Sequence, residues 1–140
     1  MRISRAPLMI MTGPLTGTMA TTSSRHSVCC RSPLTGIWGE ASAAGTWASG
    51  LKASGYDALV VTGIADQPVY LWVSDRRVEI RPAGHLWGLD TFETDKAVRA
   101  ETHPQAHVAC IGPAGERLSL IAAIMNDAKE GRAAGRTGVG

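Results

Sequence analysis

The residues best suited to chemistry lie in the run GRAAGRTGVG at residues 131–140. Its four glycines leave main-chain groups open to a ligand, because glycine has no Cβ and tolerates positive φ. Arg132 and Arg136 stand among them as permanent cations whose forked donors fit phosphate oxygens bidentately. These features indicate an anion-binding loop. The alternative that the composition leaves open is a flexible Gly-rich tail.

Two familiar phosphate-binding motifs do not fit this run. A Walker A loop would need a glycine at Glu130 and a lysine at Arg136. The GxGxxG spacing of dinucleotide-binding proteins does not occur here. If the run binds an anion, it does so outside these two motifs.

The C-terminal run has a counterpart earlier in the chain. Gly13-Pro14 opens a segment that passes Arg25 and reaches Ser-Ala-Ala-Gly at residues 42–45. Gly112-Pro113 opens a second segment that reaches Arg-Ala-Ala-Gly at residues 132–135. Internal repetition usually reflects duplicated structure. We therefore predict two units related by a pseudo-two-fold axis, whose Ala-Ala-Gly segments face one another around a ligand with two similar anionic halves.

No other arrangement of reactive residues stands out. Cys29 and Cys30 are neighbours and would point to opposite faces of a strand, so they cannot easily share a metal, and Cys110 has no partner motif. An odd cysteine count without a framework fits buried thiols in a reducing compartment. Pro104 interrupts any helix between His103 and His107, so we expect unliganded surface histidines. The sequence offers no Ser/His/Asp or Cys/His arrangement and no acid pair.

The composition limits the class of protein. The 140 residues are enough for one domain with its own core. A formal net charge of +2 is too small to indicate a nucleic-acid or membrane-surface partner, and no apolar run could span a bilayer. The apolar run at residues 6–11 is too short for a signal peptide, which favours a buried strand and a cytoplasmic protein.

The expected elements give an α+β fold with many short strands and few helices. Strands are predicted at residues 7–12, 25–31, 58–62 (buried on both faces), 69–73, 78–81 and 108–111. The fourth and fifth form a hairpin around a four-residue turn, with Val78 and Ile80 facing inward. Thr91 is predicted to cap a surface helix that runs to Glu101 and contains an Asp95–Arg99 pair.

The segments between these elements are predicted to be irregular. They are a polar loop at residues 16–24, a loop at 32–50, a turn or helix end at 51–55 and a turn at 112–115. Trp38 and Trp47 in the second loop could wall a pocket, although covering the core is the simpler expectation. Asn126-Asp127 is either a turn or a polar pair that supports the loop after it.

A set of short motifs in one order carries a family resemblance. They are GPLTGT (13–18), SPLTG (32–36), LKASGYDALVVTG (51–63), PVYLWV (68–73), HLWG (85–88), ACIGPAGE (109–116), AAIMND (122–127) and the C-terminal GRAAGRTGVG. Together they resemble the N-terminal domain of the tungsten-containing aldehyde:ferredoxin oxidoreductase family over residues 8–140. The resemblance implies two related β-sheet units that form a base for a bis-pterin tungsten cofactor of the molybdopterin type.

The resemblance also implies the binding residues. The pterin-contacting positions correspond to Arg25, Ser42, Ala44, Arg132, Ala133, Gly135 and Arg136. A magnesium ion that bridges the pterin phosphates would be bound by the main-chain carbonyls of Ser42 and Ala133. Relatives commonly have Asn-Ser-Gly-Gly at residues 42–45, so side-chain contacts there are in doubt, whereas main-chain contacts can persist.

In that family the complete enzyme oxidises aldehydes to carboxylates with oxygen from water, and a 4Fe–4S cluster passes electrons to ferredoxin. Against the family, residues 1–140 correspond to a domain that is incomplete at both ends and lacks the later cluster cysteines. We therefore expect this chain alone to bind no iron and to be inactive, with the remaining domains or subunits as partners and a homodimer left open. Two alternatives remain: a non-catalytic module that binds a phosphate-bearing ligand or a partner chain, and the same domain of an aromatic acyl-CoA reductase-type relative.

Overall fold

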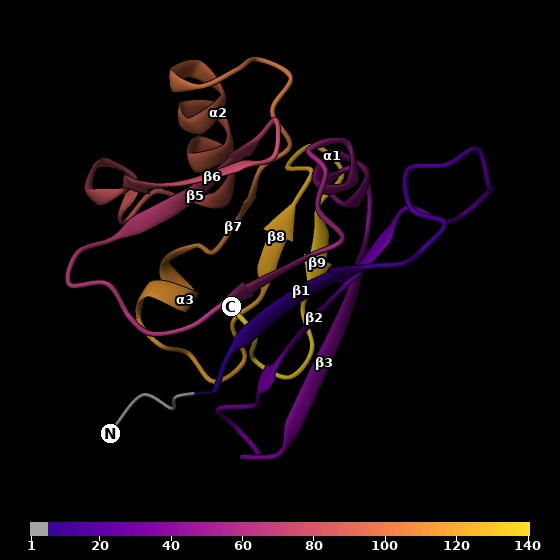
Figure 1. Cartoon of the computed structure of the whole chain (residues 1–140). Coiled ribbons are helices and arrows are strands. Elements are labelled where there is room, and N and C mark those ends of the chain that lie inside the picture. The colour runs from indigo at the N-terminus through magenta and orange to yellow at the C-terminus, as the bar shows by residue number, and fades with distance from the viewer. Residues whose placement is uncertain (1–5) are drawn as a thin grey trace.

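Four strands, including the two longest of the fold, come from the apolar and small-residue runs of the first 61 residues. In the computed structural model, which describes residues 6–140, they form one antiparallel sheet (Figure 1). Its strands are β1 (Leu8–Thr12), β2 (Arg25–Arg31), β3 (Trp38–Ala44) and β4 (Ala58–Val61), in the order β3-β2-β1-β4. The predictions of β1, β2 and the loop between them are confirmed.

Strand β3 corrects the prediction of a loop at residues 32–50. Its small residues alternate, with Gly39, Ala41 and Ala43 buried and the residues between them exposed. Glycine, alanine and serine are weak strand formers, but pairing with β2 and packing of the inner face outweigh that preference. Helix α1 (Trp47–Ala53) follows, so residues 51–55 do end a helix.

The C-terminal run is ordered and forms part of a second sheet. Its strands are β7 (Ala109–Cys110), β8 (Ile124–Asn126) and β9 (Arg132–Ala134), antiparallel and in that order. The alternative of a flexible tail is therefore wrong, because β9 pairs with β8 and Val139 is buried. The predicted turn at residues 112–115 is instead the short helix α3 (Pro113–Glu116), which starts with proline at its favoured first position.

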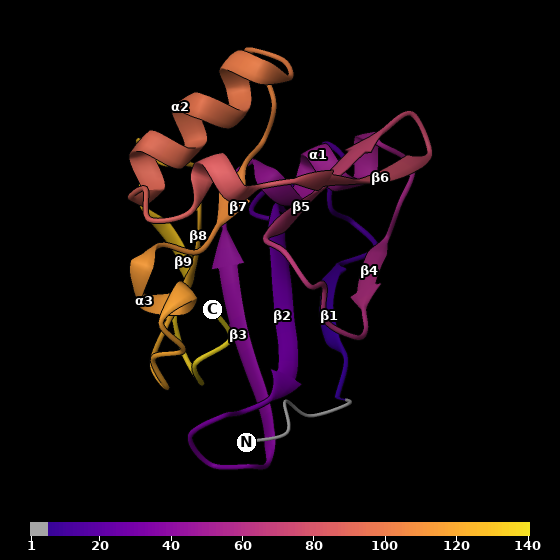
Figure 2. The same ribbon diagram turned by 90° about the vertical axis from the view of Figure 1, so that its left-hand side faces the viewer.

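The strands β1–β2–β3 and β7–β8–β9 share one plan. In each, a Gly-Pro pair follows the first strand, and the third strand is an edge strand that ends in Ala-Ala. We call them the first and second meander. Figure 2 shows β8 and β9 beside β3, with β2, β1 and β4 beyond it. The shared plan agrees with the internal repeat, while the pseudo-two-fold relation itself stays a prediction.

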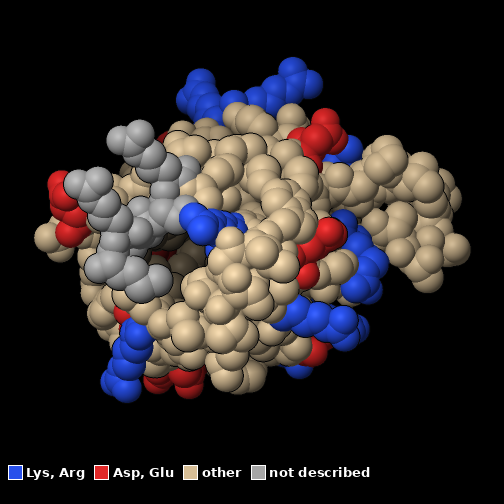
Figure 3. Space-filling view, turned by 90° about the horizontal axis from the view of Figure 1, so that it is seen from below, with Lys and Arg blue, Asp and Glu red and all other residues tan. Residues whose placement is uncertain are grey.

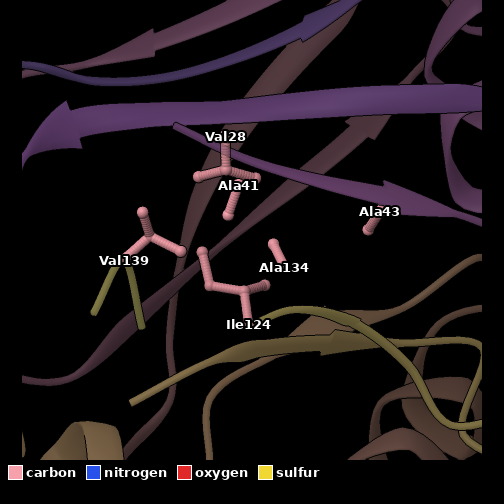
Figure 4. Close-up of a cluster of buried hydrophobic side chains, with 6 residues drawn as sticks. All are labelled: Val28, Ala41, Ala43, Ile124, Ala134 and Val139. Atoms are coloured by element: carbon pink, nitrogen blue, oxygen red, sulfur yellow. The ribbon is translucent and has the colours of Figure 1, made fainter. Parts of the chain in front are cut away.

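The main core lies between the two meanders. Val28, Ala41 and Ala43 of the first meander pack against Ile124 and Ala134 of the second and against Val139 (Figure 4). Three of these six residues are alanines, whose small side chains allow the two backbones to approach closely. The contact between edge strands β3 and β9 belongs to this core.

A separate layer covers one end of the meanders. Strands β5 (Val69–Ser74) and β6 (Arg77–Pro82) form the predicted hairpin, but its turn has two residues, Asp75 and Arg76, both with positive φ. This is the signature of a type I′ turn, whose twist suits a hairpin. The 3₁₀ helix at Gly84–Leu86 follows. Val78 and Ile80 are 44% and 70% exposed, so their predicted inward orientation is wrong.

Helix α2 (Thr91–Glu101) packs beside this hairpin over a second cluster that contains Ala83, Leu86, Val98 and Val108. Its cap is Asp90 rather than Thr91. The Asp90 carboxylate accepts from the backbone N–H groups of Phe92 and Glu93, and the Glu93 side chain completes a capping box. The predicted Asp95–Arg99 pair is present, at 2.7 Å between Oδ2 and Nε.

Two surface features complete the fold. Strand β4 is an edge strand with Val60 62% exposed, which corrects the prediction that it is buried on both faces. On the face shown in Figure 3, basic and acidic side chains are interspersed. Within residues 6–140, no helix is long and apolar enough to cross a membrane.

Candidate functional site

The first meander brings Arg25, Ser42 and Ala44 together, and we call these residues the first half-site. Arg25 pairs with Ala44 across β2 and β3, and Ser42 lies opposite Ser27. Residues directly opposite in an antiparallel pair point to one face, so the Arg25 and Ser42 side chains lie side by side. The Arg25 Nε donates to the Ser42 Oγ at 3.2 Å, and both side chains are exposed.

The second half-site consists of Arg132, Ala133, Gly135 and Arg136. Arg132 and Ala133 lie on β9, opposite Asn126 and Met125, and the other two follow the strand. Both arginines are exposed. The Arg132 Nε is 3.4 Å from the Glu130 Oε2, a loose surface pair that solvent screens.

The two half-sites meet along the edge strands. Strands β3 and β9 are in contact, and Ala43 and Ala134 belong to the same buried cluster (Figure 4). The Ser32 Oγ donates to the carbonyl of Thr137 at 3.0 Å and holds the segment after Arg136 against the first meander. The structure therefore brings the Ala-Ala-Gly segments together, as the repeat predicts.

Asn126 and Asp127 take a larger part than the sequence indicates. The Asn126 Nδ2 donates to the carbonyl of Ala44 at 3.0 Å. The Asp127 Oδ2 accepts from the Thr46 N–H at 2.6 Å, and its Oδ1 accepts from the Thr46 hydroxyl at 2.7 Å. The Asn126-Asp127 pair thus supports the earlier loop at residues 44–46. It also begins the turn at residues 127–131. Its only signal in the sequence is an Asn-Asp pair that ends an apolar run.

Thr46, His107 and Asp127 form a hydroxyl–imidazole–carboxylate cluster that sequence reasoning missed. The Thr46 Oγ1 lies 2.9 Å from the His107 Nδ1 and also bonds to the carboxylate of Asp127. In a catalytic triad the carboxylate orients the imidazole through its second nitrogen. Here the carboxylate bonds to the hydroxyl and the backbone N–H of the same threonine, so the cluster holds the loop and is not arranged as a nucleophile.

A buried imidazole lies beneath the first half-site. His26 is 3% exposed and packs against Trp47 with the rings tilted by 49° and their centroids 4.9 Å apart. Within residues 6–140, its Nδ1 has no hydrogen-bond partner. Burial lowers the pKa of His26, and the charge of Asp127 opposes that shift. Trp47 therefore packs as expected, whereas Trp38 is 61% exposed and does not cover the core.

The three thiols are buried or half-buried. Cys29, Cys30 and Cys110 are free, and burial raises the pKa of each, for Cys110 to about 11. A raised pKa disfavours the thiolate that ligates metals. Across residues 6–140, no three His, Cys, Asp or Glu side chains are grouped closely enough to hold a metal ion.

One cleft of about 320 Å³ lies next to the half-sites. It is lined by Thr46, Asp95, Arg99, Pro104 and residues 127–130, and so by none of the seven predicted binding residues. Five of those seven residues are exposed, and Ala44 and Ala133 are half-buried, which suits a platform for a large ligand. The arrangement offers guanidinium groups and the main-chain groups of two edge strands. Both are means of binding an anionic ligand and its counter-ion.

Comparison with known proteins connects this surface to a family. Residues 3–140 match the family described as aldehyde ferredoxin oxidoreductase, N-terminal domain. The chain is 49% identical over 134 residues to the tungsten-containing aldehyde ferredoxin oxidoreductases of Pyrococcus furiosus and Thermococcus kodakarensis. Each match covers 95% of this chain and 22% of the relative, so the chain spans about a fifth of their length.

More distant relatives share the domain. The chain is 34% identical over 147 residues to an aliphatic sulfonate oxidoreductase, WOR-like subunit, of Pyrococcus furiosus, covering 95% of this chain and 23% of that protein. A solved structure, the active site complex BamBC of benzoyl coenzyme A reductase in complex with 1,5-dienoyl-CoA, superposes with a TM-score of 0.91. That match has 36% identity and covers 96% of this chain and 20% of the other.

Proposed function

The chain belongs to the aldehyde ferredoxin oxidoreductase family, whose N-terminal domain it matches, and we propose that it is the cofactor platform of a tungsten-pterin oxidoreductase. In the complete protein, this platform holds a bis-pterin tungsten cofactor for the oxidation of aldehydes to carboxylates. Ferredoxin accepts the electrons. Tungsten appears in the names of the relatives that are 49% identical to the chain.

The observation that carries the proposal is the meeting of two half-sites on adjacent edge strands. Each half-site has a small-residue segment that leaves room for a ligand near the backbone and at least one exposed arginine. A cofactor with two pterins, each bearing a phosphate, has matching symmetry. The donor set fits this group, because guanidinium groups form charge-assisted hydrogen bonds to phosphate oxygens.

The magnesium ion fits the same surface. Ser42 and Ala133 lie on β3 and β9, which are edge strands, so part of the main chain there has no neighbouring strand to bond. Magnesium is a hard cation that prefers oxygen ligands such as carbonyls. We propose that the carbonyls of Ser42 and Ala133 bind the ion. Every residue type has a carbonyl, so serine can stand where relatives commonly have asparagine.

The residues of this chain bind and orient the cofactor, which when bound supplies the redox chemistry. Arg25, Arg132 and Arg136 neutralise its phosphates, and the Arg25–Ser42 hydrogen bond holds one guanidinium in place. The chain does not supply the 4Fe–4S cluster ligands, because a cubane takes four thiolates and the chain has three cysteines, two of them adjacent. We assign that cluster to the rest of the protein.

A second candidate function is reduction of an aromatic acyl-CoA. It is supported by the similarity to the benzoyl coenzyme A reductase complex, which has a TM-score of 0.91. Both candidates use the same platform, so the domain does not distinguish them. Assays of the complete protein with aldehydes and with aromatic acyl-CoA thioesters, monitored with ferredoxin, separate the two.

The platform is tested by the metal and pterin content of the full-length protein after gel filtration. Arg132→Ala and Arg136→Ala each remove charge-assisted bonds worth about 1.5–3 kcal/mol, which corresponds to roughly ten- to a hundredfold weaker retention. Ser42→Ala keeps its carbonyl and should retain most of the tungsten. Circular dichroism checks the folding of each variant.

Two results would contradict the platform. If the wild-type protein contained neither tungsten nor pterin, the domain would instead be a non-catalytic module that binds some other phosphate-bearing ligand. Loss of cofactor from Ser42→Ala, with the arginine variants fully loaded, would mean that the Ser42 side chain, and not the guanidinium groups, retains the cofactor.

A further inference from the structure

Two consecutive residues of the second meander hold the loop of the first half-site. Three hydrogen bonds run from Asn126 and Asp127 to Ala44 and Thr46, which lie about 80 positions earlier in the chain. They fix the carbonyl of Ala44 and the N–H and hydroxyl of Thr46. Both peptide groups between Ala44 and Thr46 therefore contain an atom that is hydrogen-bonded to the second meander.

The same two residues also position the second half-site. Asn126 is the cross-strand partner of Arg132. The main-chain carbonyl of Asp127 accepts from the N–H groups of Glu130 and Gly131 at 2.8 and 3.1 Å, which forms the turn that leads into Arg132. One dipeptide thus contacts the loops of both half-sites.

The side-chain amide of Asn126 indicates why asparagine stands here. Asn126 is 2% exposed, and its Nδ2 bonds to both Ala44 and Asp127, while its Oδ1 has no partner within residues 6–140. Reversing the amide would place Oδ1 against two acceptor oxygens, so this orientation is the favourable one. The Nδ2 of Asn126 therefore joins the two loops at a buried position.

The two loops are in close contact at Gly45 and Asp127. A Cβ on Gly45 would lie 1.8 Å from the Asp127 Oδ2, and Gly45 has a φ of +107°. Glycine is favoured there because it tolerates positive φ and because any Cβ would have to displace the Asp127 carboxylate. The separation of the two half-sites is thus set by direct contact.

We propose that Asn126 and Asp127 are a positioning clamp that sets the spacing of the two half-sites, so that a ligand with two linked anionic halves can bind both at once. The clamp need not contact the ligand. It acts through the carbonyl of Ala44 and through Thr46. As far as the ligand is the bis-pterin cofactor, the clamp rests on the proposed function.

The test uses the full-length protein and two pairs of variants. Asp127→Ala removes the bonds to Thr46, and Asp95→Ala is its control, because the Asp95 carboxylate lines the same cleft but pairs with Arg99 on its own helix. Asn126→Leu removes the bond to Ala44 and the unpaired oxygen, and Met125→Leu on the same strand is its control. The readouts are amide hydrogen exchange at residues 44–46, the thermal unfolding midpoint, and the rate at which tungsten and pterin are lost during dialysis.

The clamp predicts that Asp127→Ala and Asn126→Leu each accelerate exchange at residues 44–46 and cofactor loss about tenfold or more, whereas both controls stay within about twofold. Because Asn126→Leu keeps a side chain of similar volume at this buried position, both effects should exceed what the change in the unfolding midpoint accounts for. Equal effects in variant and control, or cofactor loss only in step with a lower midpoint, would overturn the clamp. Wild-type protein without cofactor would overturn the proposed function, and hydrogen exchange alone would then decide on the clamp.

Discussion

The two meanders follow one plan with different means. The strands of the first are 5, 7 and 7 residues long, whereas those of the second have 2, 3 and 3 residues. The first meander is held by continuous strand pairing. The second has few ladder bonds and depends on its turns and on packing against the first.

This difference extends to the half-sites. In the first, strand register places Arg25 beside Ser42 and a hydrogen bond fixes the guanidinium. In the second, the ion pair of Arg132 is the loose contact with Glu130, and Arg136 lies beyond the end of the strand. The first half-site is therefore preorganised by its own sheet, while the second obtains its position from the junction between the meanders.

The largest effect is expected from loosening the second meander at that junction. Ile124→Ala removes a side chain that is 8% exposed in the main core and should lower the free energy of unfolding by about 2–5 kcal/mol. Ile121→Ala makes the same change at a residue that is 74% exposed and should cost less than about 0.5 kcal/mol. Urea denaturation of the full-length protein measures both. Equal losses would mean that the second meander does not depend on this packing.

The next effect concerns the loop of the first half-site. Gly45→Ala places a Cβ against the carboxylate of Asp127 and should cost about 2–4 kcal/mol, from backbone strain together with lost hydrogen bonds. Gly63→Ala is the control, because Gly63 also has positive φ but nothing lies within 4 Å of its added Cβ. It should cost about 1–2 kcal/mol. The excess in Gly45→Ala measures the contact between the meanders, and no excess would show that Asp127 yields freely.

The sequence predicted the parts of the fold that local patterns determine. Strands β1 and β2 follow from apolar runs bounded by turn residues, and the Asp95–Arg99 pair follows from helical spacing. Strand β3 was missed because Gly-Glu-Ala-Ser-Ala-Ala has no strand preference of its own. Its conformation is imposed by β2 and by the facing meander. The inward orientation of Ile80 was wrong for a related reason, since alternation does not say which face of a hairpin is covered.

The sequence predicts which two segments form the candidate site, but not the residues that hold these segments in place. The repeated Ala-Ala-Gly segments indicated that residues 42–45 and 132–135 belong together, and the structure brings them together. The seven binding residues themselves stay a prediction. The contacts of Asn126, Asp127 and Thr46 span more than 80 positions, and no local pattern reports such a distance.

The smallest expected effect is on the pH dependence of the free energy of unfolding. His26 of the first meander is buried and its pKa is lowered, chiefly by burial, although Asp127 of the second meander opposes the shift. The unfolded chain therefore binds a proton more readily than the folded one. Stability from neutral His26 is fully present above its ordinary pKa of about 6.5 and is lost as the pH falls below it, by at most about 1.4 kcal/mol per pH unit for one proton.

His26→Phe keeps a ring against Trp47 and should flatten the slope of unfolding free energy between about pH 6.5 and 5. The exposed His103→Phe separates this effect from the loss of any imidazole. An unchanged slope in His26→Phe would mean that the carboxylate of Asp127 fully offsets the effect of burial on the pKa of His26. Protonation of His26 would then not affect stability.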